Sequence, residues 1–229
     1  MPALTAEQLD AIRRIDSPTI ANAIEHFGVR GRVEGFAGWD LRCAFPALGT
    51  MLGYAVTCTG DSTTAERREE RGLLRLWAAL EAAPKPAVIV IKDIGPEPSR
   101  SCHMGEVMAT TAKALGAVGC ISDGGLRDVN EVQALGGFQY FCPGFVVSHG
   151  NPIICEVDVP VTVAGLVVKP GDLLHGDVNG VLVIPESVAD RVVEQALKVR
   201  EAEAEVLEFL KKPGLTVEAL RRFQERFTH

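Results

Sequence analysis

Charged side chains directly follow a glycine turn in the stretch CISDGGLRDVNE, residues 120–131. An apolar segment leads into the turn at 123–125, and Arg127 and Asp128 then stand side by side, with Glu131 three residues further on. A turn requires the glycines, but it does not require an adjacent arginine and aspartate. A guanidinium binds a carboxylate or an enolate oxygen through its planar fork. One aspartate with waters is a usual way to hold Mg²⁺. The pair therefore predicts an anion site beside a metal site.

Both charges also have purely structural explanations. Arg127 can form a surface salt bridge with Asp128 or Glu131, which is worth only about 0 to 1 kcal/mol. Asp128 suits the N-cap of the short helix expected after it. Asp128 could serve both as an N-cap and as a metal ligand, because its carboxylate has two oxygens.

The helix start GEVM, residues 105–108, is the second candidate component. The first N–H groups of a helix have no intrahelical partner and carry the positive end of its dipole. Gly105 lets an anion approach this backbone closely, although a glycine can also simply begin a helix. An anion cradle, a cation and a metal ligand together suit a 2-oxo acid. Arg127 would then stabilise the enolate formed in retro-aldol cleavage or in oxaloacetate decarboxylation.

Two predicted strands must bring these segments together. Residues 86–93 and 117–122 are apolar runs typical of buried strands, and a helix over 105–116 lies between them in sequence. Ligands gather beyond the carboxyl ends of the strands in open α/β sheets. If the two strands are neighbours, we expect the helix start and the Arg127-Asp128 pair to face one crevice.

The remaining pattern predicts a single α/β domain over residues 1–229, with a core at about 15–185 and terminal helices over 186–229. Consecutive strands after residue 138 disfavour a TIM barrel. Further helices are expected at 4–15 (capping box Thr5–Gln8), 16–28 (cap Ser17), 61–83 and 129–136. Further strands are expected at 52–60, 138–148, 153–168 and 180–185, with a loop at 95–104.

The composition limits the class of protein. The net charge of −7 disfavours nucleic-acid binding, which needs clustered Lys and Arg. The first residues lack an apolar signal core, and the longest apolar runs are too short to span a bilayer. We therefore expect a cytoplasmic protein without membrane contact. None of the six cysteines forms a C-x-x-C pair, so small buried hydrophobes are favoured over a zinc site.

A few other residues invite a chemical role. His103 and His149 lie in predicted loops, where each could touch substrate or simply be hydrated. Lys92 at a strand end could form a Schiff base, but the adjacent Asp93 and the metal-type motif disfavour this. Asp123 reads as a turn residue.

The central segment resembles the RraA-like family, which includes the class II 4-hydroxy-4-methyl-2-oxoglutarate (HMG) aldolases. The family pattern is an acidic residue, twenty residues and then Arg-Asp, often with another acid three positions later. Here the pattern is Glu106, Arg127-Asp128 and Glu131. The segments SPTIANAIEHFG and VKPGDLLHGDVNGVLVIP are also similar to family segments, and the likeness covers roughly residues 15–205.

The resemblance implies a swivelling β/β/α fold, homotrimers or homohexamers, and a site between subunits. It implies that the amides of Gly105, Glu106, Val107 and Met108 bind the pyruvoyl group and that Arg127 binds substrate and stabilises the enolate. Asp128 would hold Mg²⁺ or Mn²⁺, and Glu106 would lie near the catalytic water. A glutamate from a neighbour's terminal helix approaches the metal in the aldolases; the candidates are Glu201, Glu203 and Glu205, of which spacing favours Glu203 over a solvated helix face.

Two functions follow from these expectations. The first is a divalent-metal lyase that cleaves an HMG-type 4-hydroxy-2-oxo acid to pyruvate and also decarboxylates oxaloacetate. The alternative is a non-catalytic regulator that binds RNase E, for which the acidic charge is suitable. A complete metal site is more than a binding surface requires, and this favours the enzyme.

Overall fold

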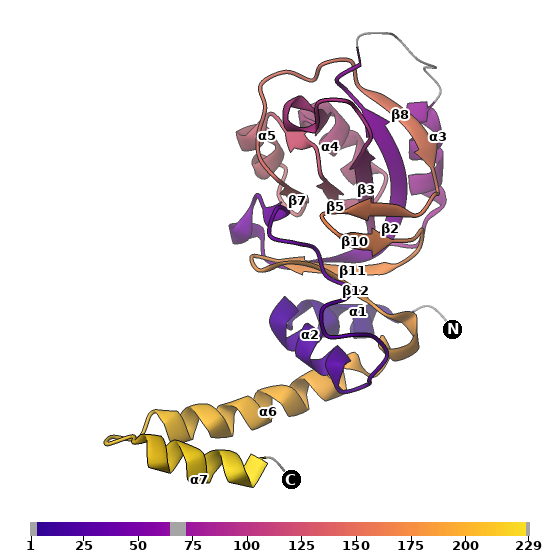
Figure 1. Ribbon diagram of the computed structural model, residues 1–229. Helices are drawn as coiled ribbons and strands as arrows, with labels where there is room; N and C mark the ends of the chain where they lie inside the picture. Colours follow the sequence, from indigo (N-terminus) through magenta and orange to yellow (C-terminus); the bar gives the residue numbers. More distant parts are fainter. Residues whose placement is uncertain (1–3, 65–71, 228–229) are drawn as a thin grey trace.

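The computed structural model describes residues 4–64 and 72–227 of the chain. Its centre is an eight-stranded mixed sheet in the order β1-β7-β5-β3-β2-β11-β12, with β8 also paired to β2. Figure 1 shows this sheet curling into a nearly closed barrel, with helices packed on its outside and helical extensions below it. The α/β class and the helical ends expected from the sequence are confirmed.

The strands of the large sheet are β1 (Arg42–Cys43), β2 (Met51–Asp61), β3 (Ala87–Asp93), β5 (Ala117–Ser122), β7 (Gln139–Cys142), β8 (Ile153–Val157), β11 (Leu173–Asp177) and β12 (Gly180–Ile184). Two small sheets pair β4 (Cys102–Met104) with β6 (Gly125–Leu126), and β9 (Val161–Val163) with β10 (Leu166–Val168). The α-helices are α1 (Ala6–Arg13), α2 (Ser17–Glu25), α3 (Gly72–Ala82), α4 (Glu106–Ala114), α5 (Val129–Ala134), α6 (Val192–Leu210) and α7 (Val217–Phe227). Short 3-10 helices lie at Pro46–Leu48, Pro98–Arg100 and Glu186–Val188.

Four parallel strands, β2, β3, β5 and β7, form the part of the sheet that carries the site. The predicted strands 86–93 and 117–122 are direct neighbours, in a register that places Val88 opposite Gly119. The apolar run of β3 is completely buried because both faces of the strand are covered. The carboxyl ends of β3 and β5 consequently open at the same edge of the sheet.

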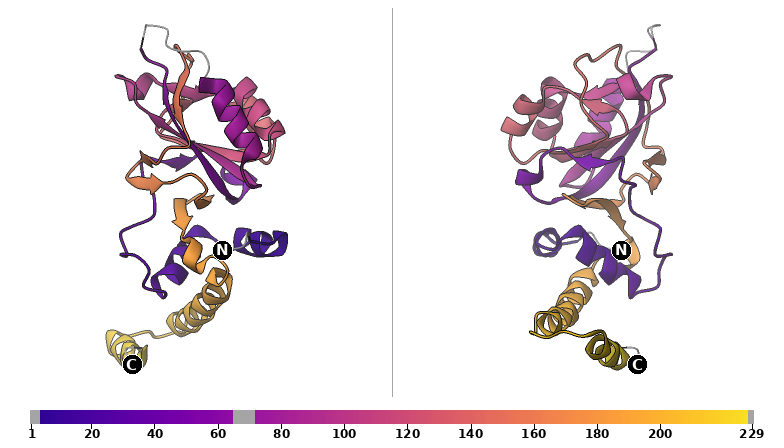
Figure 2. Two further views of the ribbon diagram at one scale, coloured as in Figure 1. Left: turned by 90° about the vertical axis from the view of Figure 1, so that its right-hand side faces the viewer. Right: turned by 60° about the vertical axis from the view of Figure 1, so that its left-hand side comes forward.

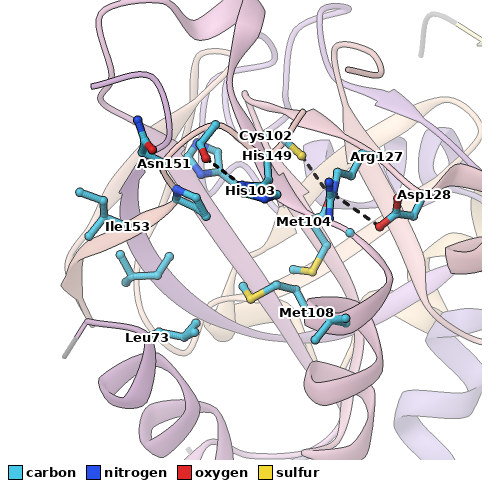
Figure 3. A pocket seen from close by; sticks show the side chains of 15 residues that line it. Leu73, Cys102, His103, Met104, Met108, Arg127, Asp128, His149, Asn151 and Ile153 are labelled. Carbon is cyan, nitrogen blue, oxygen red and sulfur yellow. Dashed lines mark hydrogen bonds and ion pairs between the residues drawn. The ribbon is translucent and has the colours of Figure 1, made fainter. Parts of the chain in front are cut away.

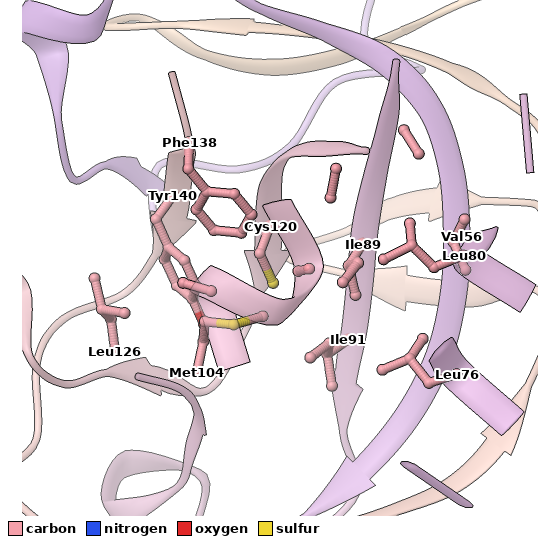
Figure 4. Packing of buried hydrophobic residues seen from close by; sticks show 14 of the residues in the cluster. Val56, Leu76, Leu80, Ile89, Ile91, Met104, Cys120, Leu126, Phe138 and Tyr140 are labelled. Carbon is pink, nitrogen blue, oxygen red and sulfur yellow. The ribbon is translucent and has the colours of Figure 1, made fainter. Parts of the chain in front are cut away.

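Helices α3, α4 and α5 cover one face of these parallel strands. Figure 4 shows Leu76 and Leu80 of α3 beside Ile89 and Ile91 of β3, with Tyr140 further along the sheet. All five side chains are fully buried. Burial of each such side chain stabilises the fold by about 1.5 to 3 kcal/mol, so this packing fixes α3 on strand β3.

The N-terminal helices and α6 pack together beneath β11 and β12. Figures 1 and 2 show α6 and α7 projecting away from the body of the molecule. Val199 is the last buried residue of α6, and the rings of Phe209 and Phe223 stack at 4.0 Å between centroids. A projecting helical pair agrees with the expected oligomer contact, which stays a prediction. No helix in the described part of the chain is long and apolar enough to cross a membrane.

The capping box at the start of α1 is confirmed, but the predicted cap of α2 is wrong. Asp16 caps α2 by accepting the N–H of Thr19 at 2.9 Å, and Ser17 is the first helical residue. The Ser17 side chain is buried, and its hydroxyl lies 2.9 Å from His175 Nδ1. Its N–H donates to Asp177. These contacts with β11 hold Ser17 inside the helix and leave the capping position to its neighbour.

Within the described part of the long helix predicted over 61–83, Gly72–Ala82 is helical and residues 61–64 are not. Asp61 instead ends β2, and its carboxylate accepts the N–H groups of Thr63 and Thr64. An aspartate that bonds the backbone two residues ahead favours a turn over a helix. The part of the prediction at 65–71 lies outside the described residues. The loop predicted at 95–104 also contains strand β4.

Asp16 also links the two terminal regions, because Arg200 of α6 donates to its carboxylate at 2.8 Å. Burial would raise the pKa of Asp16, but hydrogen bonds from Arg200 and Thr19 outweigh it and lower the pKa to about 2. Because the pKa of Asp16 is lower in the folded than in the unfolded protein, its ionised carboxylate stabilises the fold above about pH 4. This stabilisation is lost as the pH falls towards 2 and the carboxylate becomes protonated.

We expect Asp16→Ala to lower the free energy of unfolding at pH 7 by about 1 kcal/mol, the usual value of a cap, and the melting temperature by about 2 to 4 °C. The difference from the wild type should shrink between pH 4 and pH 2, where the wild-type carboxylate becomes protonated. Thermal unfolding followed by circular dichroism at pH 7, 4 and 2 measures the difference in melting temperature between the two proteins. Asp10→Ala, which removes an exposed carboxylate paired with Arg14, is the control and should have almost no effect.

Candidate active site

A short parallel ladder joins the two loops that leave β3 and β5. Strand β4 precedes α4, strand β6 precedes Arg127, and the two strands pair through Cys102–Gly125 and Met104–Leu126. The Arg127 N–H then donates to the Met104 carbonyl at 3.1 Å. This ladder is the reason that the start of α4 and the Arg127-Asp128 pair lie in one place.

Asp128 is held directly against the start of α4. Its Oδ2 accepts the Glu106 N–H at 3.1 Å and lies 3.5 Å from Arg127 Nε. Asp128 adopts a left-handed backbone conformation at φ 54° and makes no side-chain cap to α5, the helix that it precedes. The alternative explanation, that Asp128 serves as the N-cap of the helix after it, is therefore wrong: the carboxylate caps α4 instead. The expected contact between Arg127 and Asp128 is present.

The next two backbone donors of α4 remain open. Within the described residues, the N–H groups of Val107 and Met108 meet no acceptor, whereas the Ala109 N–H is bonded to the Gly105 carbonyl. Open N–H groups at the positive end of a helix bind anions. The tip of α4 therefore has one donor bonded to Asp128 and two donors available to a ligand.

Gly105 is required here for space. A Cβ at this position would lie 2.7 Å from Asp128 Oδ2 and 3.1 Å from Arg127 Cγ, while the backbone itself is extended. We expect Gly105→Ala to displace both charged side chains. The pyruvate-forming reaction expected from the sequence should then slow about 100-fold, the usual effect of a misplacement near 1 Å. Steady-state kinetics with a folding check by circular dichroism tests this. Gly144→Ala is the matched control, because its Cβ would meet nothing within 4 Å.

These groups border a cavity of about 510 Å³. Figure 3 shows Arg127 and Asp128 on one side, Leu73 and Ile153 on the opposite side, and Met104 and Met108 between them. The lining also includes Gly105 and Val107. Of the predicted site residues, only Glu106 does not line the cavity: its side chain is exposed, and its backbone N–H provides the contact with Asp128.

Two histidines line the same cavity. His149 is exposed, and its Nδ1 bonds the Gly150 carbonyl at 2.7 Å. His103 lies in β4 and is only 4% exposed, so the expectation of a hydrated loop residue is wrong for this histidine. Strand pairing with β6 buries it. The sequence offered His149 as a candidate for the same crevice, and His149 does line the cavity.

A buried polar network lies behind His103. Its Nε2 is 2.5 Å from Asp93 Oδ2 and 2.9 Å from Ser101 Oγ, and Ser101 also bonds Asp93. Burial would raise the pKa of Asp93, but the hydrogen bonds from His103 and Ser101 outweigh it and lower the pKa. Asp93 was not among the site residues predicted from the sequence. Its position at the end of a buried strand was the available signal.

The two other charged residues at these strand ends pair with each other. Lys92 Nζ lies 2.5 Å from Asp123 Oδ2, and Asp123 also accepts the Asp93 N–H at 2.6 Å. Neither residue lines the cavity. Asp123 thus ties the turn after β5 to the end of β3, which is more than the turn role expected of it.

Asp128 is the carboxylate best placed for a divalent cation. Its Oδ2 is occupied by Glu106 N–H and Arg127, which leaves Oδ1 for a metal. No group of three or more His, Cys, Asp or Glu side chains suited to a metal occurs within the described residues. A single carboxylate nevertheless fits Mg²⁺ or Mn²⁺, hard cations that keep several water ligands and take others from a substrate.

Cys102 is the cysteine that borders the cavity. Burial raises the pKa of this thiol, an effect larger than the opposing influence of Arg127. Burial also raises the pKa of the Cys142 thiol to about 11. Both residues therefore remain neutral near pH 7 and act as small hydrophobic side chains.

A family model and a related sequence both match most of this chain. The family model described as "RraA-like: Aldolase/RraA" matches residues 12–183. A Halalkalibacterium halodurans protein provisionally named 4-hydroxy-4-methyl-2-oxoglutarate aldolase is 30% identical over 171 residues, which cover 74% of this chain and 78% of that protein.

Solved structures share the fold. An uncharacterised Pseudomonas syringae pv. tomato protein has a TM-score of 0.72 at 23% identity, covering 99% of this chain and 95% of its own. Streptomyces coelicolor RraAS2, described as an unusual member of the RNase ES inhibitor RraA family, has a TM-score of 0.68 at 24% identity, covering 90% and 98%. The swivelling β/β/α fold implied by the sequence is thereby confirmed, and the chain belongs to the RraA-like family.

Proposed function

We propose that this protein is a divalent-metal-dependent lyase that cleaves an HMG-type 4-hydroxy-2-oxo acid to pyruvate by a retro-aldol reaction, with oxaloacetate decarboxylation as a second activity. One observation carries the proposal: the open N–H groups of α4, the Arg127 guanidinium and the Asp128 carboxylate border one cavity. Both reactions pass through the enolate of pyruvate, and these groups are suited to hold it.

The residues of this chain have separate tasks in the proposed reaction. The N–H groups of Val107 and Met108 bind the substrate carboxylate at the positive end of α4. The Arg127 fork lies beside the C2 oxygen and stabilises its negative charge as the enolate forms. Asp128 would hold Mg²⁺ or Mn²⁺, which when bound supplies Lewis-acid polarisation of the 2-oxo group. Glu106, at the family's acidic position, remains the predicted neighbour of the catalytic water.

The name of the H. halodurans relative supports the aldolase activity at the level of the family. The regulatory alternative, binding to RNase E, is supported by the acidic net charge of −7 and needs no cavity of this kind. The predicted trimer or hexamer, with Glu203 of a neighbour near the metal, belongs to the same proposal. Within one chain, Glu203 Oε1 accepts a hydrogen bond from the Asn22 side chain of α2 at 3.2 Å.

We expect the purified protein to release pyruvate from HMG or from oxaloacetate, to lose this activity in EDTA and to regain it with Mg²⁺ or Mn²⁺. Coupled pyruvate detection measures the rate, and a panel of 4-hydroxy-2-oxo acids differing at C4 identifies the substrate. Turnover of neither substrate, or turnover unaffected by EDTA, contradicts the proposal. Capture of RNase E at physiological salt by an inactive protein would favour the regulator.

A further inference from the structure

The end of the cavity away from the charged pair, Arg127 and Asp128, is apolar. Figure 3 shows Leu73 and Ile153 at this end, with Met108 between them and the charged pair. These side chains come from three different elements, α3, β8 and α4. Leu73 and Ile153 together form an apolar wall, which a ligand that extends across the cavity from the charged pair meets with its far end.

Close packing of α3 on β8 holds the apolar wall in place. A Cβ at Gly72 would lie 1.7 Å from the Ile154 carbonyl oxygen, so a glycine is required for α3 to begin this close to the strand. One turn later, Arg75 Nη2 donates to the Cys155 carbonyl at 3.0 Å. Leu73 directly follows the tight contact at Gly72, so its position at the cavity is fixed by the fold.

Within the described residues, the lining of the cavity offers no cation at the apolar wall. Apart from the charged pair, the lining side chains that can carry a charge near pH 7 are two histidines. His103 is buried and bonded to Asp93. The His149 Nδ1 donates to the Gly150 carbonyl at 2.7 Å, so the neutral ring has only an acceptor left, at Nε2. A carboxylate placed at the wall would therefore lose hydration without gaining an ion pair.

The cavity has room for a substituent beyond the pyruvoyl group. Its volume of about 510 Å³ lies within the range of about 300 to 1,000 Å³ that encloses drug-sized ligands. In the proposed function the pyruvoyl group occupies the tip of α4 and the charged pair, so C4 and the group that it carries extend towards the apolar wall. An apolar group there leaves water and gains binding free energy.

We propose that the substrate carries an apolar alkyl or aryl group at C4, in contact with Leu73 and Ile153, where HMG carries a second carboxylate; this inference rests on the proposed function and deepens it. Cleavage breaks the C3–C4 bond, and its electron pair forms the enolate with the charge on the C2 oxygen. The C4 hydroxyl loses its proton as the C4 carbonyl forms, and C3 gains one proton. The products are pyruvate and an apolar aldehyde or ketone.

A matched pair of substrates tests the inference. 4-Hydroxy-4-methyl-2-oxopentanoate differs from HMG only by a methyl group in place of the C4 carboxylate, and both compounds release pyruvate. We expect the kcat/KM of the methyl compound to exceed that of HMG by at least about 10-fold, the smallest effect usual for one group in an apolar pocket. The C4 phenyl compound, 4-hydroxy-2-oxo-4-phenylbutanoate, should exceed HMG by more.

A cation placed on the wall should change this preference. Leu73 is 37% exposed, so a lysine there keeps its ammonium group hydrated and its stem packed. We expect Leu73→Lys to shift the ratio of the two kcat/KM values towards HMG by about 10-fold or more. Leu74→Lys is the matched control, because Leu74 is the next residue of α3, is 70% exposed and does not line the cavity. It should keep the wild-type ratio.

Binding provides a readout that is independent of turnover. Neither 4-methyl-2-oxopentanoate nor 2-oxoglutarate has a C4 hydroxyl to cleave, and calorimetry with Mg²⁺ present should show tighter binding of the first, apolar compound. A wild-type preference for HMG or for 2-oxoglutarate, or a ratio unchanged in folded Leu73→Lys, overturns the inference and leaves the lyase proposal intact. A wild-type protein that releases pyruvate from none of these substrates, nor from oxaloacetate, overturns the proposed function and this inference with it.

Discussion

Replacing Arg127 with Ala should lower both pyruvate-forming activities by about 100- to 1,000-fold, the cost of removing one donor that stabilises an oxyanion. The guanidinium borders the cavity beside Asp128, and in the proposed reaction it faces the C2 oxygen as that atom becomes negative. Aldol cleavage and decarboxylation share this enolate, so the two rates should fall together.

Arg127→Lys should recover only part of the activity, because an ammonium group cannot form the planar pair of hydrogen bonds made by a guanidinium. Arg100→Ala is the matched control: this arginine lies five residues before Gly105 but pairs with Glu97 at the surface. Its rates should stay within about twofold of the wild type, since such a pair is worth about 0 to 1 kcal/mol. Full activity in folded Arg127→Ala would remove the enolate site from the proposal.

Replacing Asp128 with Asn should abolish most metal-dependent turnover while keeping the fold. Asn tolerates the left-handed backbone found at φ 54°, and its amide oxygen can still accept the Glu106 N–H. The lost property is the negative charge that holds a divalent cation. Because changes in residues that merely support a ligand cost about 10- to 100-fold in metal affinity, loss of the ligand charge should cost at least about 10-fold.

Calorimetric titration with Mn²⁺ measures this affinity, and pyruvate release measures turnover. Asp158→Asn is a control of the same chemistry, because Asp158 is also an aspartate with a left-handed backbone, at φ 58°, and it does not line the cavity. It should bind metal like the wild type. If Asp128→Asn binds Mn²⁺ with unchanged affinity, the metal is held elsewhere.

Much of the fold could be predicted from local sequence. The runs 86–93 and 117–122 are apolar and rich in β-branched residues, and they are buried parallel strands. Gly116 ends the α4 segment in a left-handed conformation, as expected of a glycine there. In these places a short stretch of chain contains all the information, because periodicity, turn chemistry and propensity agree.

The errors occur where distant contacts outweigh local preference. Ser17 is a good capping residue by type, but His175 and Asp177 hold it within α2 and Asp16 takes the cap. Asp128 suits by type the N-cap of the helix that follows it, but it caps α4 across the ladder instead. Local sequence contains no trace of these partners, which lie 22 to 160 residues away.

By itself, the sequence determined the chemical components: a glycine at a helix start, an Arg-Asp pair after a turn, and two strands able to carry them. Only the tertiary structure decided that the β4–β6 ladder brings these components to one cavity, and that Asp93 stands behind His103 while Glu106 faces away. Residue types and short-range spacing are encoded along the chain, so they can be read directly. The distance between side chains of separate loops depends on strand pairing and packing, which are settled only when the whole sheet forms.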